Sequence, residues 1–319
     1  MARIVVLGRI PQPAVERLRA AHDVEAFDEA EPPSREEVLR LVVGADAIVS
    51  LLTTRIDGEV LDAAGPQLRV VANVAVGYDN IDVPACDERG VVATNTPDVL
   101  TEATADIAMA LTLMVTRRLG EGERLIRAAD PWRWGMFFML GSSVQQRQFG
   151  VVGMGKIGQA TAERARAFGM SIAYTKRTRL APDLEERLGA RQMSLDELLA
   201  TSHVVSLHCP YGPETHHLID AERLRTMRED AYLINTARGA VVDEAALVDA
   251  LRSGTIAGAG LDVFEHEPDV HPGLLTCDNA VLLPHLGSAT VETRQAMADL
   301  AAMNALAVLA GERPLTPIG

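Results

Sequence analysis

The sequence has few aromatic residues, few cysteines and no excess of basic side chains. Aromatic residues make up 4% of the 319 residues, and the apolar share of 48% is mostly Ala, Val and Leu. That composition suits helices packed on a buried parallel sheet. The net charge of -14 offers no positive surface for nucleic acid. We therefore expect no nucleic-acid partner.

Long apolar runs are also missing. The longest, Ile107 to Val115, is well under the roughly 20 residues that a membrane span needs, and the run from Ile4 to Leu7 is too short for a signal peptide. The three cysteines, Cys86, Cys209 and Cys277, lie far apart without metal-type spacing. We expect buried thiols, no metal site, no membrane association and a cytoplasmic location.

The chain is long enough for about two domains. The first part alternates apolar runs with helical stretches, which predicts strands at 3–7, 24–27, 47–50, 70–74 and 91–94 and helices at 14–21, 34–43 and 59–64. A strongly helical stretch starts at Thr101. Further strands are expected at 149–152, 171–175, 204–207, 231–235, 257–262 and 281–283, with helices at 159–168, 195–200, 221–227, 244–253 and 292–310. This alternation predicts an α/β fold with two doubly wound parallel-sheet domains.

A glycine-rich turn joins the predicted strand at 149–152 to the helix that follows. It reads Gly153-Met154-Gly155-Lys156-Ile157-Gly158, and a second strand follows at 171–175. Strand, G-x-G-x-x-G, helix and strand is the order that holds a dinucleotide pyrophosphate at a helix N-terminus. Three close glycines can also be ordinary turn chemistry, but both flanking strands and the helix favour the dinucleotide site.

The end of that second strand indicates which dinucleotide is bound. An NAD site wants an acidic residue there, whereas a 2′-phosphate needs positive charge. The sequence reads Tyr174-Thr175-Lys176-Arg177-Thr178-Arg179, with three cations and no carboxylate. Arg177 can make charge-assisted bonds to phosphate oxygens. We expect NADPH rather than NADH, although a solvated basic turn is the alternative interpretation.

Three reactive side chains follow three of the predicted strands. Arg238 comes after the strand at 231–235, Glu267 after 257–262 and His285 after 281–283. Arg can bind a substrate carboxylate, protonated His can donate a proton to a carbonyl, and Glu can orient the imidazole. Each could instead be structural: a surface cation, a turn residue before Pro268, a buried histidine. Their placement at the carboxyl ends of strands in one sheet favours a shared site.

The stretch from Asp130 to Leu140 is unusually apolar for a loop. It contains both tryptophans of the chain and two of its six phenylalanines. Such a surface must be covered by its own domain or by another subunit. Because aromatic residues and Met are enriched in interface cores, we expect a homodimer contact through the nucleotide-binding domain.

These motifs together make the sequence similar to the D-isomer-specific 2-hydroxyacid dehydrogenases over nearly its whole length. The matching motifs, in family order, lie at 74–82, 95–102, 153–158, 235–239, 261–268 and 284–288. The residues at 99–106 and 176–179 resemble the glyoxylate/hydroxypyruvate reductase branch. One departure is Gln146-Arg147, where the family usually has Gly-Lys. It lies away from the chemistry.

The resemblance implies a flavodoxin-like substrate-binding domain at 1–98, completed by the C-terminal helix within 289–319, and a Rossmann dinucleotide-binding domain at 99–288, with a cleft between them. It implies that Arg238, Glu267 and His285 are catalytic, with Glu267 rather than Glu265 at the matching position. For the substrate, besides Arg238 and His285, it points to backbone groups at Val76 and Gly77, with weaker candidates at Leu51, Leu52, Trp134 and Phe137. For the cofactor it adds to the glycine-rich turn and the 176–178 cluster Thr104, Cys209, Pro210, Thr236, Ala237, Asp262 and Gly287.

The expected activity is NADPH-dependent reduction of a small 2-oxo acid, glyoxylate or hydroxypyruvate, to the D-2-hydroxy acid, with His285 as proton donor. The same chemistry on a larger acid, such as phenylpyruvate or a branched-chain keto acid, is one alternative. Another is a dinucleotide-sensing corepressor, since proteins resembling C-terminal-binding protein keep this fold and these residues. We expect such a protein to carry long disordered flanks, which these 319 residues do not include.

Overall fold

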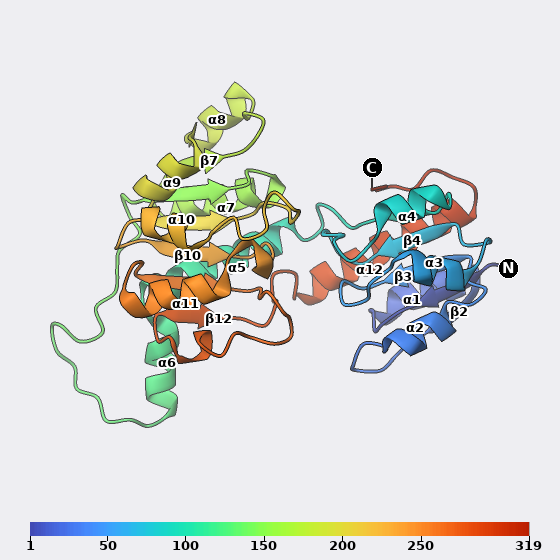
Figure 1. The fold of residues 1–319 in the computed structure, drawn as a ribbon, viewed down its shortest axis with the longest axis horizontal. Coiled ribbons are helices and arrows are strands. Elements are labelled where there is room, and N and C mark those ends of the chain that lie inside the picture. Colours follow the sequence, from blue (N-terminus) through green and yellow to red (C-terminus); the bar gives the residue numbers. More distant parts are fainter. Residues whose placement is uncertain (319) are drawn as a thin grey trace. The chain divides into compact units, whose positions relative to one another are not determined.

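The computed structural model describes residues 1–318 and divides into two compact units. Unit 1 comprises Met1–Leu100 and Ser288–Gly319, and unit 2 comprises Thr101–Gly287. The boundaries predicted from the sequence lie after residues 98 and 288. Each unit contains its own parallel sheet (Figure 1), which confirms the predicted α/β class.

Unit 1 is built on five parallel strands in the order β2-β1-β3-β4-β5 over the described residues. Every residue of the central strands β3 and β4 is buried, as expected for a parallel sheet covered on both faces. The bounds are β1 Arg3–Val6, β2 Asp23–Ala26, β3 Ala47–Ser50, β4 Val70–Asn73 and β5 Val92–Thr94.

Helices cover both faces of this first sheet. On one face α12 packs against α1 and across β3, β4 and β5, so the last helix is part of unit 1. On the other, α2, α3 and α4 enclose a core with Ile48 and Val71. A capping box between Ser34 and Glu37 starts α2, and Asp57 caps α3. The bounds are α1 Gln12–Arg19, α2 Arg35–Leu41, α3 Gly58–Ala64, α4 Val83–Glu88 and α12 Val291–Leu309.

Unit 2 is built on seven parallel strands in the order β12-β11-β10-β9-β6-β7-β8 over the described residues. Its connections cross over between β6 and β9, so the order reverses there, as in a doubly wound nucleotide-binding sheet. The bounds are β6 Gln148–Val152, β7 Ser171–Thr175, β8 Ala190–Gln192, β9 Val204–Leu207, β10 Tyr232–Asn235, β11 Gly258–Leu261 and β12 Ala280–Leu282.

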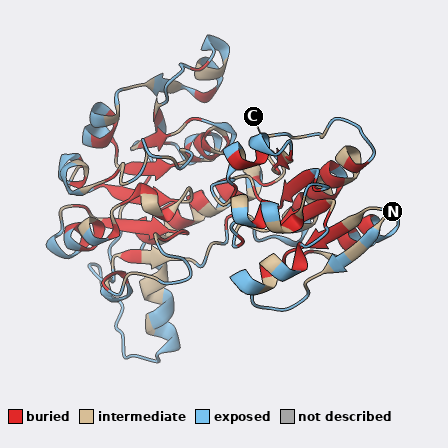
Figure 2. Cartoon of the chain, turned by 45° about the vertical axis from the view of Figure 1, so that its right-hand side comes forward, coloured by how far each residue is buried: buried red, intermediate tan, exposed pale blue. Residues whose placement is uncertain are grey.

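Two groups of helices enclose this sheet, and Figure 2 shows the strands as the buried layer between them. Helices α5 and α7 share a core with one face, and α9, α10 and α11 share a core with the other. The bounds are α5 Thr101–Thr116, α6 Leu119–Arg127, α7 Lys156–Ala167, α8 Pro182–Leu188, α9 Leu195–Thr201, α10 Ala221–Thr226 and α11 Glu244–Ser253, with short 3-10 turns at Gly239–Val241 and Leu274–Thr276.

Four short elements were not predicted from the sequence: α4, α6, α8 and β8. Helix α4 has only six residues, with Asp82 as its cap. Helix α6 contains two glycines, starts after Arg118 in a left-handed conformation and has no buried residue. Strand β8 has three residues at the edge of the sheet. None of them carries enough buried apolar residues to give a clear periodic signal.

Candidate active site

Three neighbouring strands of unit 2 carry the predicted catalytic residues. Strands β10, β11 and β12 pair in register, Asn235 with Leu261 and Leu261 with Leu282. Because they are parallel, the loops that follow them leave the same edge of the sheet. Those loops contain Arg238, Glu267 and His285.

Glu267 and His285 form a direct pair. Nδ1 of His285 lies 2.7 Å from Oε2 of Glu267, and the other carboxylate oxygen accepts the N–H of Phe264 at 3.0 Å. Burial raises the pKa of Glu267, but the hydrogen bond and charge of His285, the Phe264 N–H and the charge of Arg238 together outweigh it and lower that pKa overall. Glu267 is therefore ionised at neutral pH.

The loop that carries His285 is held by one buried residue, Asp262. The Asp262 carbonyl accepts the His285 N–H at 2.9 Å, and its two carboxylate oxygens accept the N–H groups of Leu286 and Gly287 at 2.6 and 2.8 Å. These bonds keep His285 at a positive φ of 54°. Burial raises the pKa of Asp262, against the lowering effect of the two N–H groups. The resemblance implied a cofactor contact for Asp262 but not this anchoring role.

The Arg238 loop is held by Asn235, the last residue of β10. The Asn235 amide donates to the carbonyl of Arg238 at 2.8 Å, and its oxygen accepts the N–H of Ala237 at 3.0 Å. The Arg238 guanidinium itself donates to the carbonyl of Ala237 at 2.8 Å. Asn235 was noted only as part of a motif. A buried amide at the end of a strand is the signal that could have identified this role.

Gly239 brings the Arg238 loop against the loop that leads to Glu267. A Cβ at Gly239 would lie 1.8 Å from the carbonyl carbon of Phe264, so only glycine fits there. The structure therefore places the Arg238 and Glu267 loops side by side, while His285 meets Glu267 from the next strand.

The glycine-rich turn shows a different environment for each glycine. Gly153 has a φ of 94°, and a Cβ there would lie 2.5 Å from the amide nitrogen of Cys209. A Cβ at Gly158 would lie 2.4 Å from the carbonyl of Gly153, so helix and strand pack closely. A Cβ at Gly155 would meet no protein atom within 4 Å. The fold itself requires Gly153 and Gly158, whereas the space beside Gly155 is open to a ligand.

The start of α7 is suited to an anion. Gly155 is its N-cap residue, no side chain caps it and the first turn contains no acidic residue. Such an N-terminus presents backbone N–H groups to a phosphate. The side chain of Met154 is fully buried in the core, so Met154 can contribute only its backbone here.

The arginines of the basic cluster after β7 differ in their environments. Arg179 pairs with Glu185 at 2.8 Å, and Glu185 also accepts the Tyr174 hydroxyl, so Arg179 serves the structure of this corner. Arg177 has a side chain 89% exposed and lies 3.9 Å from Glu214. The alternative of a structural basic turn thus applies to Arg179, while Arg177 is available to a ligand.

Other predicted cofactor residues lie on or beside the same sheet edge. Thr104, at the start of α5, donates to the carbonyl of Gly287 at 3.1 Å. The Thr236 hydroxyl is buried and has no hydrogen-bond partner, which suits a group that a bound molecule would satisfy.

Two of the three cysteines differ from the expectation of burial. Cys86 is buried, but Cys209 and Cys277 are only partly buried. Burial raises the pKa of Cys86 and of Cys209 to about 11, so both are thiols at neutral pH rather than nucleophiles. Cys209 lies two residues after β9, and its backbone packs against Gly153.

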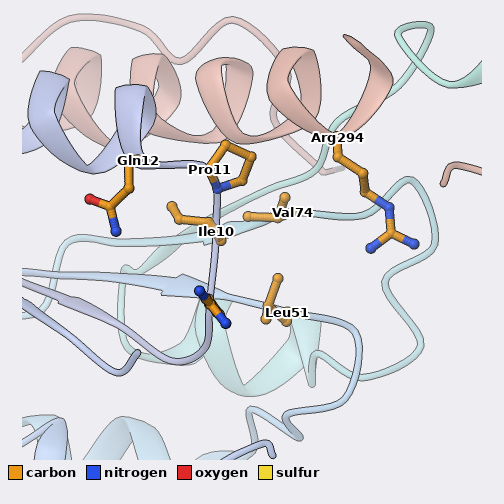
Figure 3. Close-up of a pocket in the computed structure, with 7 residues that line it drawn as sticks. Ile10, Pro11, Gln12, Leu51, Val74 and Arg294 are labelled. Carbon is orange, nitrogen blue, oxygen red and sulfur yellow. The ribbon is translucent and has the colours of Figure 1, made fainter. Parts of the chain in front are cut away.

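In unit 1, asparagine side chains hold the peptide groups of two predicted substrate residues, and Leu51 lines a pocket. The carbonyl of Val76 accepts from the Asn95 amide at 2.8 Å, and that of Gly77 from the Asn73 amide at 3.0 Å, so both peptide groups are fixed. The pocket has a volume of about 420 Å³ and is shown in Figure 3. Of the two candidate leucines, Leu51 and Leu52, only Leu51 is part of its lining, which consists of Arg9, Ile10, Pro11, Gln12, Leu51, Val74 and Arg294.

The two arginines of this pocket were not identified from the sequence. Arg294, on the first turn of α12, donates to the carbonyl of Ser288 at 3.3 Å, and Arg9 pairs with Asp28 at 3.2 Å. Gln12 begins α1 beside them. Arg9 lies in the loop that follows β1. The rule that ligands bind beyond the carboxyl ends of strands could therefore have indicated this loop.

Two negative findings concern residues 1–318. No group of three or more His, Cys, Asp or Glu side chains there is arranged to hold a metal ion. None of the helices in that range has the length and apolar character that crossing a membrane requires.

Known proteins resemble this chain both within unit 2 and over nearly its whole length. A family model described as "D-isomer specific 2-hydroxyacid dehydrogenase, NAD binding domain" matches residues 109–287. A protein named glyoxylate reductase from Thermococcus onnurineus (strain NA1) is 49% identical over 319 residues, covering 98% of this chain and 95% of that protein.

Solved structures show the same similarity. The TT0316 protein from Thermus thermophilus has a TM-score of 0.92 at 45% identity, over 99% of this chain and 100% of that one. An NADPH-dependent glyoxylate/hydroxypyruvate reductase from Sinorhizobium meliloti, solved in complex with NADP and malonate, has a TM-score of 0.88 at 39% identity, over 100% of this chain and 97% of that one.

Proposed function

Because this chain belongs to the D-isomer specific 2-hydroxyacid dehydrogenase family, we propose that it reduces glyoxylate or hydroxypyruvate with NADPH to the corresponding 2-hydroxy acid, which has the D configuration where C2 is a stereocentre, as in the hydroxypyruvate product. The observation that carries the proposal is the 2.7 Å pair of His285 and Glu267, whose loops follow β12 and β11, the two strands on one side of β10 and its Arg238 loop. The names of the similar proteins support reduction of a small 2-oxo acid.

Each catalytic residue has one role in this proposal. Glu267 binds Nδ1 of His285, so Nε2 is the nitrogen that can present a proton to the substrate carbonyl. Arg238 binds the substrate carboxylate with its planar guanidinium, and Asn235 fixes the loop that aims it. A nicotinamide held by these residues would supply the hydride for C2 of the acid.

The cofactor residues fit a dinucleotide. Backbone groups from Gly153 to Gly158 and the α7 N-terminus would hold the pyrophosphate, and the open space beside Gly155 would admit it. The unpartnered Thr236 hydroxyl would bond the nicotinamide half. Other contacts are proposed at Thr104, Cys209, Pro210, Ala237, Asp262 and Gly287.

A preference for NADPH over NADH is part of the proposal. Arg177 is almost fully exposed at the end of β7, with Lys176 and Thr178 beside it, and a 2′-phosphate there would gain charge-assisted bonds. The Sinorhizobium meliloti relative, with NADP bound, supports this preference.

For the substrate we propose contacts with Leu52, Val76 and Gly77 in unit 1. The fixed peptide groups at Val76 and Gly77 support a role in binding a small carboxylate. The neighbouring pocket contains two guanidinium groups and no acidic residue, which also favours an anionic ligand.

We further propose a homodimer formed through the segment that follows α6. Trp134 is 80% exposed, Phe137 is 86% exposed and Met136 is 76% exposed. Figure 1 shows this green segment as a long trace that leads away from α6. An apolar surface of this kind marks an interaction site, and its aromatic and Met side chains suit the core of an interface.

A cytoplasmic location is also proposed, and it rests on the three cysteines, all of which are free thiols in the structure. Fractionation of the source cells with an antibody against the protein tests it directly. Recovery in an extracytoplasmic fraction would contradict it.

The activity is tested by following NADPH and NADH oxidation with glyoxylate, hydroxypyruvate, phenylpyruvate and a branched-chain 2-oxo acid. We expect the two small acids and NADPH to give the highest kcat/KM. His285→Ala should lower kcat by about 10²-fold or more, because the proton donor is lost, and Arg238→Ala should chiefly raise the KM of the acid. Near-normal turnover by His285→Ala would refute the mechanism.

A further inference from the structure

A second cluster of charged side chains lies behind the proposed catalytic loops of unit 2. It consists of His217, from the connection after β9, Glu265, two residues before Glu267, and Glu244, the first residue of α11. None of the three has a part in the proposed reaction.

The two glutamates bind each other's backbone. Oε1 of Glu244 accepts the N–H of Glu265 at 2.8 Å, and Oε2 of Glu265 accepts the N–H of Glu244 at 3.2 Å. Glu244 is buried, with 4% of its surface exposed. Burial raises the pKa of Glu244, and the nearby Glu265 carboxylate raises it further. Two carboxyl groups this close need a positive partner if both are to be ionised.

His217 can supply that partner. Its Nε2 lies 2.5 Å from Oε1 of Glu265, and its side chain is 35% exposed whereas that of Glu265 is 16% exposed. His217 is held in a left-handed conformation with a φ of 47°, and its N–H donates to the carbonyl of Ala240 at 2.8 Å. A strained, non-glycine residue of this kind persists only where its surroundings fix it.

These bonds join both proposed catalytic loops. Ala240 lies in the 3-10 turn directly after Arg238. Glu265 lies in the loop after β11 that also contains Glu267. Gly239 packs against Phe264, whose N–H binds the Glu267 carboxylate at 3.0 Å. His217 thus contacts one loop through its backbone and the other through its imidazole.

We propose that His217 and Glu265 are positioning residues of the reductase site, which lock the Arg238 loop against the Glu267 loop and so fix the aim of Glu267 at His285. The inference rests on the proposed catalytic set. Neither residue touches the reacting atoms in this proposal.

Other titratable groups face this cluster. The ring of His216 stacks on that of His217 with centroids 4.1 Å apart, and Nδ1 of His216 lies 3.3 Å from the Tyr211 hydroxyl. His271 lies near Glu244 and lowers its pKa by its charge and by a backbone hydrogen bond. His216 is a matched control for His217, because it is the same residue type in the same segment and its ring nitrogen faces Tyr211 rather than a glutamate.

The test compares His217→Ala, His217→Gln and His216→Ala in the full-length protein with its cofactor. His217→Ala should lower kcat/KM about 10- to 100-fold, since a displaced catalytic group costs this much, and His217→Gln should recover part of the loss because its amide can still donate to Glu265. His216→Ala should stay within about twofold of wild type. The alkaline limb of the pH profile should move to lower pH in His217→Ala, because a poorly aimed Glu267 stabilises the His285 cation less.

A double substitution separates this role from general stability. If both residues act through one bond, His217→Ala with Glu265→Ala should lose no more kcat/KM than Glu265→Ala alone. Equal losses in the His217 and His216 variants, or a lower Tm in His217→Ala with an unchanged pH profile, would overturn the proposal.

A readout that needs no turnover distinguishes this proposal from the proposed function. The NMR signal of the His285 ring, identified by its loss in His285→Gln, should titrate at lower pH in His217→Ala and unchanged in His216→Ala. If wild type reduces no 2-oxo acid, the proposed function fails, while the NMR titration still supports or refutes the positioning role. An unshifted His285 titration in His217→Ala would refute it.

Discussion

Glu267 faces His285 across two adjacent strand ends, with Oε2 2.7 Å from Nδ1 of the imidazole. The remaining oxygen of the carboxylate is taken by the Phe264 N–H at 3.0 Å. This hydrogen bond within the Glu267 loop orients the carboxylate toward the histidine. Replacing it tests charge and geometry separately.

Glu267→Gln keeps a carbonyl oxygen for the Phe264 N–H but removes the negative charge. We expect kcat/KM to fall by about tenfold or more, because the His285 cation loses its partner. The pKa of Glu267 is lowered in the folded protein, so its ionised form stabilises the fold at neutral pH, and this contribution is lost as the pH falls through the lowered pKa. Urea unfolding at neutral and acidic pH should therefore show a larger acid-induced loss in wild type than in Glu267→Gln. An equal loss in both would contradict the assignment.

Gly155→Ala and Gly158→Ala should separate cofactor binding from folding. A methyl group at Gly155 meets no protein atom within 4 Å, so Tm should not change, whereas cofactor affinity should fall about tenfold or more because the pyrophosphate loses its space. A methyl group at Gly158 lies 2.4 Å from the Gly153 carbonyl and should cost about 1–3 kcal/mol of stability. Thermal unfolding and cofactor titration measure the two effects. Unchanged cofactor binding in Gly155→Ala would be incompatible with the site.

Arg177 and Glu214 should have opposite effects on NADPH use. Arg177→Ala should raise the KM of NADPH about 10- to 100-fold, since charge-assisted hydrogen bonds contribute about 1.5–3 kcal/mol. Glu214→Gln removes the carboxylate 3.9 Å from Arg177 and should lower that KM by no more than about fivefold, because exposed ion pairs are weak. The KM of NADH should change little in either variant. A similar rise for both coenzymes in Arg177→Ala would place Arg177 outside the 2′-phosphate site.

Cys86 should make unit 1 sensitive to alkaline pH. Its thiol is fully buried, and burial raises its pKa from 9.0 to about 11. The buried thiol therefore stabilises the fold below pH 9, and this contribution is lost as the pH rises through about 11. The loss amounts to about 2 kcal/mol. Cys86→Ala, although less stable at pH 7, should lose less stability than wild type between pH 8 and 10.5 in urea unfolding. Parallel losses in the two proteins would contradict the prediction.

Trp134 and Phe137 should control the oligomeric state. The double change Trp134→Ser with Phe137→Ser should convert a dimer into a monomer in sedimentation experiments, because it removes two large exposed aromatic side chains from the proposed interface. Phe168→Ser is the control, since Phe168 is also exposed but follows α7, away from this segment of the chain. A wild-type protein that sediments as a monomer at micromolar concentration would refute the dimer.

The sheets and their central strands were predictable because they are apolar and buried on both faces. The prediction for β3, 47–50, has the same bounds as the strand, and β9 at 204–207 does too. The three catalytic candidates were found by the rule that loops after parallel strands share one edge. That rule needs only the order of the elements along the chain.

The interactions that the sequence did not predict join residues that are distant in sequence, or pair opposite charges that cancel. Arg179 counted as one of the three cations of the basic cluster, but it pairs with Glu185 at 2.8 Å, and nothing in the sequence indicated that partner. His217 and Glu265 are 48 positions apart, and no periodicity or motif indicates that they meet. Asp262 was expected to contact the cofactor, but its two bonds to the His285 loop depend on the tertiary course of the chain after β12.

The strand order of unit 2 separates two properties that an engineer would want to change independently. The groups proposed to select the coenzyme follow β7, on one side of β6, and those proposed to bind the acid and move the proton follow β10, β11 and β12, on the other. Substitutions more than about 7–10 Å apart with no shared partner usually act additively. Such a layout lets natural lineages or laboratory selections exchange one phosphate preference for another while leaving acid–base chemistry intact.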